Sequence, residues 1–276
     1  MSITNIRGGI IMFDYHMHSE FSADCDTPME ETIEAAIQKG IKEICFTEHI
    51  DYEYPDPTIE FELDVKNYDQ KIKEVQQRYK NEIVIKKGVE IGVQPHILER
   101  YNKLLDEETF DFIICSVHAA DKKNLHRGDF FINRTAEEAY ELYYEELLYC
   151  VKNFDAYNIL GHMDLVKRYK ALTSDANFHD IIQQIFKTII PKGKGIEVNT
   201  SGFAYGLNSA MPSVDILKLY HQCGGEIITV GSDAHEAHHV AHRFGESYQL
   251  LDTIGFKYIA TFDNRKPKFH SIKQFL

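Results

Sequence analysis

The sequence predicts a parallel α/β barrel built as one domain, and three observations support this prediction. Short apolar runs recur along the chain at residues 10–15, 44–47, 83–89, 112–117, 157–161, 195–198 and 227–232. Segments with helical start and stop signals separate these runs, and strand alternating with helix is typical of a parallel sheet with right-handed crossovers. No Gly/Ser linker divides the 276 residues, a length that α/β barrels often use as one domain.

Helix signals follow the apolar runs in order. Thr27 is the expected N-cap of the first helix, with Glu30 completing a capping box and Gly40 ending the helix. Thr135 begins a second capping box, and Ser213 is the expected cap of a later helix. The other helices are expected at residues 67–80, 94–106, 140–151, 176–190, 214–223 and 237–252.

Composition restricts the class of protein. The formal net charge of −13 argues against a broad nucleic-acid interface, which requires clustered Lys and Arg. No run approaches the roughly 18 apolar residues of a membrane span, and no secretion signal begins the chain. The five cysteines form no C-x-x-C pair, as expected for a reducing compartment. We therefore expect a cytoplasmic protein that binds neither nucleic acid nor membrane, with its oligomeric state open.

Acidic, imidazole or amide side chains follow every apolar run. Because the carboxyl ends of the strands meet on one face of a parallel barrel, these side chains should converge there. A cluster of buried carboxylates and imidazoles is costly unless it coordinates something. The sequence therefore predicts a metal site at this face. The side chains in question are His16, His18, Glu48, His49, Glu90, His118, His162, Asn199, Asp233 and His235.

The order of these motifs resembles the PHP (polymerase and histidinol phosphatase) superfamily. The matching segments are His16-Met-His18-Ser-Glu-Phe-Ser-Ala-Asp24, Phe46-Thr-Glu-His49, Gly88-Val-Glu90, Cys115-Ser-Val-His118, Leu160-Gly-His-Met-Asp164 and Gly231-Ser-Asp-Ala-His235. Asn199-Thr-Ser-Gly202 resembles the histidinol-phosphatase branch. The resemblance implies a distorted (β/α)₇ TIM-like barrel with its metal site at the C-terminal ends of the strands. Residues 12–276 would form this single domain, and residues 1–11 an extension before Met12, a second candidate start.

The same resemblance implies a centre of two or three divalent metal ions. One ion would take His16, His18, Glu90 and Asp233; a second would take Glu90 as a bridge with His118 and His162; a third would take Asp24, His49 and His235. Nitrogen-rich ligands mixed with carboxylates suit Zn, Fe or Mn better than Mg or Ca.

The activity implied is hydrolysis of L-histidinol phosphate to L-histidinol and phosphate, a step of histidine biosynthesis. A metal-activated hydroxide would attack phosphorus, with Glu90 and Asp233 as catalytic residues. The nearest alternative is another phosphoesterase of the superfamily, acting on a nucleotide or sugar phosphate. A metal-dependent amide or deaminase hydrolase and a non-catalytic metal-binding module are less favoured, since three metals suit a phosphoryl group and every ligand position is filled.

A small phosphorylated substrate is the expected partner. Arg168 and Lys167 are candidates for its phosphate, while Asp121 and Asp129, in the loop after His118, are candidates for its ammonium and imidazole. Ala204 marks a departure from the branch, which often carries a basic residue soon after Asn-Thr-Ser-Gly; this departure favours the alternative substrates. The residues expected to bind substrate are Arg168, Lys167, Asn199, Asp121 and Asp129.

Overall fold

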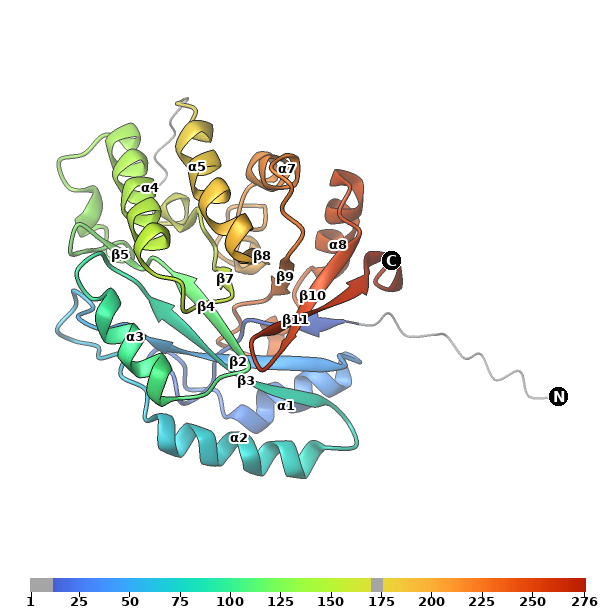
Figure 1. The fold of residues 1–276 in the computed structure, drawn as a ribbon. Coiled ribbons are helices and arrows are strands. Elements are labelled where there is room, and N and C mark those ends of the chain that lie inside the picture. Colours follow the sequence, from blue (N-terminus) through green and yellow to red (C-terminus); the bar gives the residue numbers. More distant parts are fainter. Residues whose placement is uncertain (1–11, 170–175) are drawn as a thin grey trace.

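Seven parallel strands form one sheet in the computed structural model, which describes residues 12–169 and 176–276 (Figure 1). In sheet order the strands are β1 (Phe13–Asp14), β2 (Glu43–Ile50), β3 (Val84–Gly92), β4 (Phe112–Ser116), β7 (Ile159–Leu160), β8 (Gly195–Asn199) and β9 (Ile228–Gly231). The sheet curls into a nearly closed barrel, because Tyr15 N donates to Val230 O at 3.1 Å and Met17 bridges Ala234 in parallel.

Each of the seven apolar runs overlaps one of these strands, which confirms the predicted distorted (β/α)₇ barrel. The expected extension at residues 1–11 lies outside the described residues. That residues 12–276 form a single domain stays a prediction.

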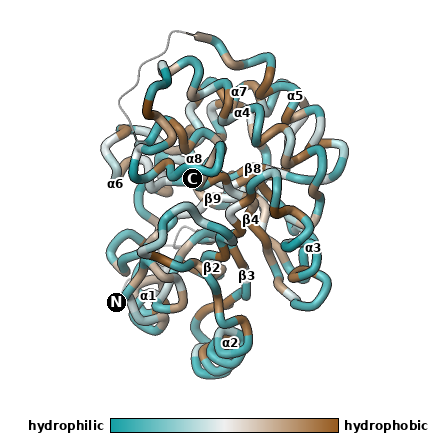
Figure 2. Tube along the Cα trace, turned by 90° about the vertical axis from the view of Figure 1, so that its left-hand side faces the viewer, coloured by the Kyte–Doolittle hydropathy of each residue, from teal (hydrophilic) through white to brown (hydrophobic). Residues whose placement is uncertain are grey.

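Helices cover the outside of the barrel (Figure 1). They are α1 (Met29–Gln38), α2 (Val65–Tyr79), α3 (Leu98–Glu107), α4 (Ala136–Asn153), α5 (His179–Ile189), α6 (Ser201–Ala204), α7 (Val214–Gln222) and α8 (Phe244–Ile254). α5 shows how they dock: Ile182, Ile185, Phe186 and Ile189 recur at helical spacing and are all buried. Figure 2 shows the resulting pattern, with apolar residues concentrated along the strands and polar residues along the outer helices. Burying each such side chain contributes about 1.5–3 kcal/mol.

The predicted cap of the first helix is wrong, whereas that of α4 is confirmed. Thr27 donates its hydroxyl to His235 O at 2.8 Å, so it is engaged elsewhere, and the Glu20 carboxylate accepts from Met29 N instead. At α4 the Thr135 side chain accepts from Glu138 N, completing the capping box. Ser213 precedes α7 without a side-chain cap, because its Oγ accepts from Lys167 Nζ at 3.0 Å.

Two of the predicted helices begin earlier in the sequence than the helices of the structure. The segment at 237–252 divides into a short 3₁₀ turn, Ala237–His239, and α8, because Ala241 and Arg243 adopt positive φ values of 51° and 56°. The helix expected at 94–106 begins only at Leu98. Gln94 is buried in the preceding turn, where its side-chain amide reaches Tyr52 O and Glu53 O at 3.3 Å.

A C-terminal hairpin, absent from the predictions, covers the amino-terminal end of the barrel. It pairs β10 (Tyr258–Asp263) with β11 (Lys266–Ser271) in antiparallel register. Tyr15 OH accepts from Phe262 N at 3.0 Å, and Arg265 N donates to Asp111 O at 2.8 Å. The opposite, carboxyl-terminal end is thereby left as the end that opens to a pocket. A second, two-residue ladder pairs β5 (Ala119–Ala120) with β6 (Lys123–Asn124) near that end.

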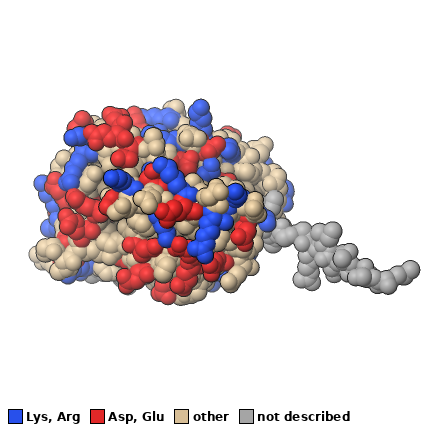
Figure 3. Space-filling view, turned by 90° about the horizontal axis from the view of Figure 1, so that it is seen from below, with Lys and Arg blue, Asp and Glu red and all other residues tan. Residues whose placement is uncertain are grey.

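The surface carries both signs of charge. On the face drawn in Figure 3, Lys and Arg lie between patches of Asp and Glu. Within residues 12–169 and 176–276, no helix is long and apolar enough to cross a membrane.

Candidate metal centre

Nine side chains meet at the carboxyl-terminal end of the barrel, where the strands deliver them. The loop after β1 supplies His16 and His18, β2 supplies His49, and β3 supplies Glu90. The segments that follow β4, β7 and β9 supply the remaining imidazoles and a carboxylate, and Asp24 comes from the turn before α1. The full group is His16, His18, Asp24, His49, Glu90, His118, His162, Asp233 and His235.

Glu90 lies at the middle of the group and is fully buried. Its Oε2 is 3.0 Å from His16 Nε2 and 3.3 Å from His49 Nδ1. Its Oε1 is 3.0 Å from His162 Nε2 and 3.3 Å from His118 Nε2. His18 Nε2 also lies 3.5 Å from Oε2, so the two oxygens face two different groups of imidazoles, as expected of a carboxylate that bridges two ions.

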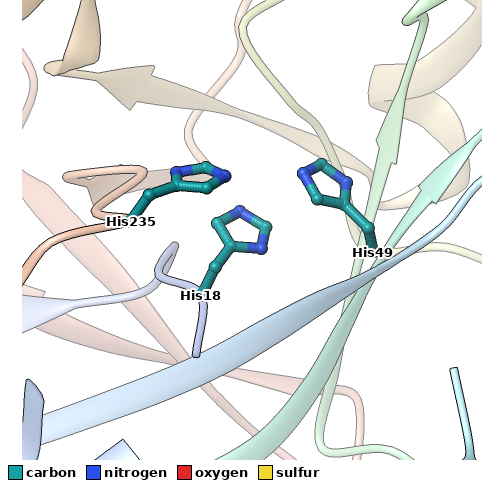
Figure 4. A group of neighbouring side chains, drawn as sticks. All are labelled: His18, His49 and His235. Carbon is teal, nitrogen blue, oxygen red and sulfur yellow. The ribbon is translucent and has the colours of Figure 1, made fainter. Parts of the chain in front are cut away.

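His18, His49 and His235 form a second part of the centre (Figure 4). The ring of His18 stacks between the other two, with centroids 4.3 Å from each. Asp24 Oδ2 lies 3.2 Å from His235 Nε2 and 3.6 Å from His49 Nε2. His18 also borders Glu90, whose Oε2 is 3.5 Å from His18 Nε2.

Asp233 joins the two parts. Its Oδ1 lies 3.3 Å from His18 Nε2 and 3.6 Å from His16 Nε2. Its Oδ2 accepts from Ser201 Oγ at 3.1 Å and lies 3.5 Å from Arg168 NH1. The backbone of Asp233 has φ of +53°, a conformation that costs energy in a residue with a Cβ and is frequent at functional sites. One oxygen therefore faces the imidazoles and the other faces a cation.

The donor set fits divalent metal ions. Metal–nitrogen bonds of about 2.1 Å in a tetrahedron place neighbouring ligand atoms about 3.4 Å apart, and the nitrogen–oxygen distances here run from 3.0 to 3.6 Å. His18 Nε2 and His49 Nδ1 are buried without a hydrogen-bond partner, although both face Glu90. Buried polar atoms are nearly always satisfied, so these two require a ligand.

Charges within the centre shift its titration strongly. Burial opposes ionisation of Glu90, but His16 and His118 outweigh it and hold its pKa well below the usual range. Burial, together with the neighbouring His49, lowers the pKa of His18 to about 3. Burial also disfavours the charged form of His235, yet the Asp24 carboxylate raises its pKa to about 9. Protons on the imidazoles thus offset the negative charge of the buried carboxylates. Metal ions would compete with these protons for the same side chains.

Two carboxylates that sequence reasoning missed support the imidazoles from behind. Glu197 Oε2 lies 2.9 Å from His16 Nδ1, and Asp51 Oδ2 lies 2.6 Å from His118 Nδ1. A signal was present in both cases: Asp51 is two residues after His49, and Glu197 interrupts an apolar strand two residues before Asn199. Side chains two apart on a strand share a face, so both point toward the barrel interior.

A pocket of about 770 Å³ opens above the centre. Six of the nine side chains line it, namely Asp24, His49, His118, His162, Asp233 and His235. Other parts of its walls come from the loop after β2 and from the segments after β6 and β7. Arg168 enters it with only 8% of its side chain exposed, and Tyr205 stacks on the guanidinium at 3.4 Å. Tyr54, Asp56, His126, Arg127, Tyr169 and Glu236 also line the pocket.

Among the residues expected to bind substrate, the structure brings only Arg168 to the pocket wall. Lys167 turns away to Asp164, at 3.1 Å. Asn199 is buried beneath Asp233, to whose Oδ2 its amide nitrogen lies at 3.3 Å. Asp121 pairs with Arg134 and Lys123 outside the pocket, and Asp129 is exposed in the 3₁₀ turn Asp129–Phe131. Loop paths decide these positions, and the sequence pattern does not encode them.

Fold and centre together define a class of protein. The model of the PHP domain matches residues 14–201, and the chain belongs to this family. The curated histidinol-phosphatase of Lactococcus lactis subsp. lactis is 34% identical over 258 residues, 92% of this chain and 95% of that protein. A probable histidinol-phosphatase of Clostridium acetobutylicum is 29% identical over 265 residues, 94% of this chain and 100% of that protein.

A solved structure agrees with these relatives. The crystal structure of histidinol phosphate phosphatase from Lactococcus lactis subsp. lactis, in complex with zinc, L-histidinol and phosphate, superposes with a TM-score of 0.84. It shares 33% identity and covers 93% of this chain and 98% of that one. The barrel described above is therefore also the fold of an enzyme crystallised with metal and both products of a phosphomonoester hydrolysis.

Proposed function

We propose that this protein is a metal-dependent phosphomonoesterase that hydrolyses L-histidinol phosphate to L-histidinol and phosphate. The observation that carries the proposal is Glu90, whose two oxygens face separate groups of imidazoles at ligand spacing. Relatives that match nearly the whole chain are histidinol-phosphatases, and one was crystallised with zinc, L-histidinol and phosphate. A cytoplasmic location belongs to the same proposal.

His16, His18, Glu90 and Asp233 would hold one ion, Glu90, His118 and His162 a second, and Asp24, His49 and His235 a third. Ions bound there would lower the pKa of a water molecule and neutralise charge on the phosphoryl oxygens. The chain's own contribution is to fix these ligands on strand ends, where packing and hydrogen bonds hold them. Asp233, with its second oxygen free of imidazoles, is placed to pass a proton away from the reacting water.

Arg168 would hold the phosphate. Its Nε is buried with no hydrogen-bond partner, so an anion in the pocket would satisfy it. The Tyr205 ring packs over the guanidinium and fixes its plane. This contact gives Tyr205 a function in the segment after Asn-Thr-Ser-Gly. Lys167, engaged with Asp164, has no part in this proposal.

Asp56 would accept a hydrogen bond from the ammonium or imidazole group of histidinol, the role that the sequence predicted for Asp121 and Asp129. It lines the pocket and is mostly buried. Thr58 donates to its Oδ1 from both backbone nitrogen and hydroxyl, and Arg127 Nε lies 2.9 Å from its Oδ2. The carboxylate is therefore held in place, and its Oδ2 keeps a lone pair for one more donor.

Replacing Asp56 by asparagine is expected to lower kcat/KM for L-histidinol phosphate selectively, by roughly 10–150-fold, the equivalent of one charged hydrogen bond. An aryl phosphate without nitrogen donors should lose little. Arg168→Ala should instead weaken both substrates alike, and Asp121→Asn should change neither. The measurement is steady-state kinetics of the four proteins on both substrates. Equal losses on both substrates in Asp56→Asn would remove Asp56 from recognition.

The proposed activity is tested by assaying the zinc-loaded protein against a panel of phosphomonoesters and one amide. L-histidinol phosphate should give the highest kcat/KM, with nucleotide and sugar phosphates far behind and the amide untouched. Preference for a nucleotide or sugar phosphate would show that the protein has another phosphoesterase activity of the same family. Amide cleavage without phosphate release would overturn phosphoester hydrolysis.

A further inference from the structure

Glu197 is a buried carboxylate in the strand β8, between the apolar Ile196 and Val198. Glycines flank its side chain on both sides, Gly231 in β9 and Gly161 directly after β7. A Cβ on Gly231 would lie 3.0 Å from Glu197 Oε2, and one on Gly161 would lie 3.4 Å from Oε1. An ionised group in such a place is expensive unless donors surround it, so its surroundings indicate what it does.

Three donors converge on the two oxygens of Glu197. Oε2 lies 2.9 Å from His16 Nδ1, while Oε1 accepts from His162 N at 2.7 Å and from Asn199 Nδ2 at 3.0 Å. The peptide nitrogen of His162 can only donate. Ser201 N donates to Asn199 Oδ1 at 3.0 Å. This bond orients the Asn199 amide so that its Nδ2 faces Glu197. Oε1 therefore acts as an acceptor, and the ionised carboxylate accepts at Oε2 as well.

The carboxylate of Glu197 determines which ring nitrogen of His16 carries the proton. With a carboxylate against Nδ1, the ring carries its proton on Nδ1 and presents the lone pair of Nε2. That nitrogen is the one 3.0 Å from Glu90 and 3.6 Å from Asp233. The opposite tautomer would place a proton where a metal ion must bind.

Glu197 also reaches Asp233 through Asn199. The same Nδ2 that donates to Glu197 lies 3.3 Å from Asp233 Oδ2, and Ser201 Oγ donates to that oxygen at 3.1 Å while it also contacts Asn199 Oδ1. Asn199 is fully buried and lies between the two carboxylates, which would otherwise repel each other. This position explains a polar residue at the end of β8 without any contact to substrate.

We propose that Glu197 is a positioning residue that selects Nε2 of His16 as the metal-binding nitrogen and, through Asn199, fixes Asp233. The inference rests on the proposed function in taking the centre to hold metal. Glutamine at position 197 presents one acceptor and one donor to three donors. If its amide nitrogen faces His16, the imidazole must move its proton to Nε2 to accept, and the ligand is lost.

The test is zinc binding by the metal-free, full-length protein, measured by competition with a chromophoric chelator. Glu197→Gln should bind the tightest zinc ion 10–100-fold more weakly, the usual effect of removing a partner behind a metal-binding histidine. Glu197→Asp, which keeps two acceptor oxygens, should recover part of the loss. Asp111→Asn is the matched control, because it removes one negative charge at the amino-terminal end of the barrel, where Asp111 accepts from Lys87 N and Asn264 N.

A second readout does not depend on any variant folding. In ¹⁵N NMR of the zinc-loaded wild type, the His16 ring should appear protonated on Nδ1 and metal-bound through Nε2. A His16 ring bound through Nδ1, or wild-type zinc affinity in a folded Glu197→Gln protein, would overturn the proposal. Both measurements are made without substrate, so a wild type that binds zinc but does not hydrolyse L-histidinol phosphate would refute only the proposed function.

Discussion

Replacing Glu90 by glutamine is expected to lower kcat/KM for L-histidinol phosphate by about 10³-fold. The substitution keeps the shape of the side chain and removes the negative charge that five imidazoles share. These are His16, His18 and His49 at one oxygen and His118 and His162 at the other. Bound metal should fall as well, because the bridge contributes to two ions. The measurements are steady-state kinetics and metal content by plasma spectrometry.

Glu43→Gln is the matched control for this result. Glu43 begins β2 at the opposite end of the barrel, where Tyr15 OH donates to it, so its substitution removes a strand glutamate far from the centre. It should retain full metal and near-normal turnover. Near-normal turnover with full metal content in Glu90→Gln would refute the bridging role.

Removal of the metal ions is expected to abolish phosphate release and to lower thermal stability. Without ions, buried carboxylates and imidazoles such as Glu90, His16 and His18 must share protons in a space closed to water. Metal at 1,000 times its dissociation constant would stabilise the folded chain by about 4 kcal/mol. For a chain of this length that corresponds to a Tm shift on the order of 10 °C.

Calorimetry of the protein before and after dialysis against a chelator measures this shift, and zinc added back should restore both Tm and activity. An unchanged Tm together with unchanged activity after complete metal removal would exclude a metal centre in this pocket. Glu90→Gln is the useful comparison, because dialysis against the chelator should lower its Tm much less than that of the wild type.

The barrel and the set of converging side chains were predictable because both depend on short-range pattern. Seven apolar runs correspond to seven strands, and the polar residue that ends each run lies at the carboxyl-terminal face by the geometry of parallel sheets. The capping box at Thr135 has the same origin, since all of its hydrogen bonds lie within four residues.

Features that depend on contacts distant in sequence were not predictable in this way. Thr27 fails as a cap because its hydroxyl meets His235, about two hundred residues later. The hairpin of β10 and β11 covers a barrel end that no local pattern describes. Asp56 enters the pocket and Asp121 does not, although both are loop aspartates, because Arg127 and Thr58 hold the first while Arg134 and Lys123 hold the second outside.

Anomalous X-ray diffraction from crystals of the zinc-loaded protein would locate the ions of a multi-metal centre bridged by Glu90. We expect two or three zinc peaks in the pocket, with the two oxygens of Glu90 each about 2.0–2.2 Å from a different ion. His118 and His162 should bind one of these ions and His16 the other. A single peak, or peaks that Glu90 does not contact, would refute a multi-metal centre bridged by Glu90.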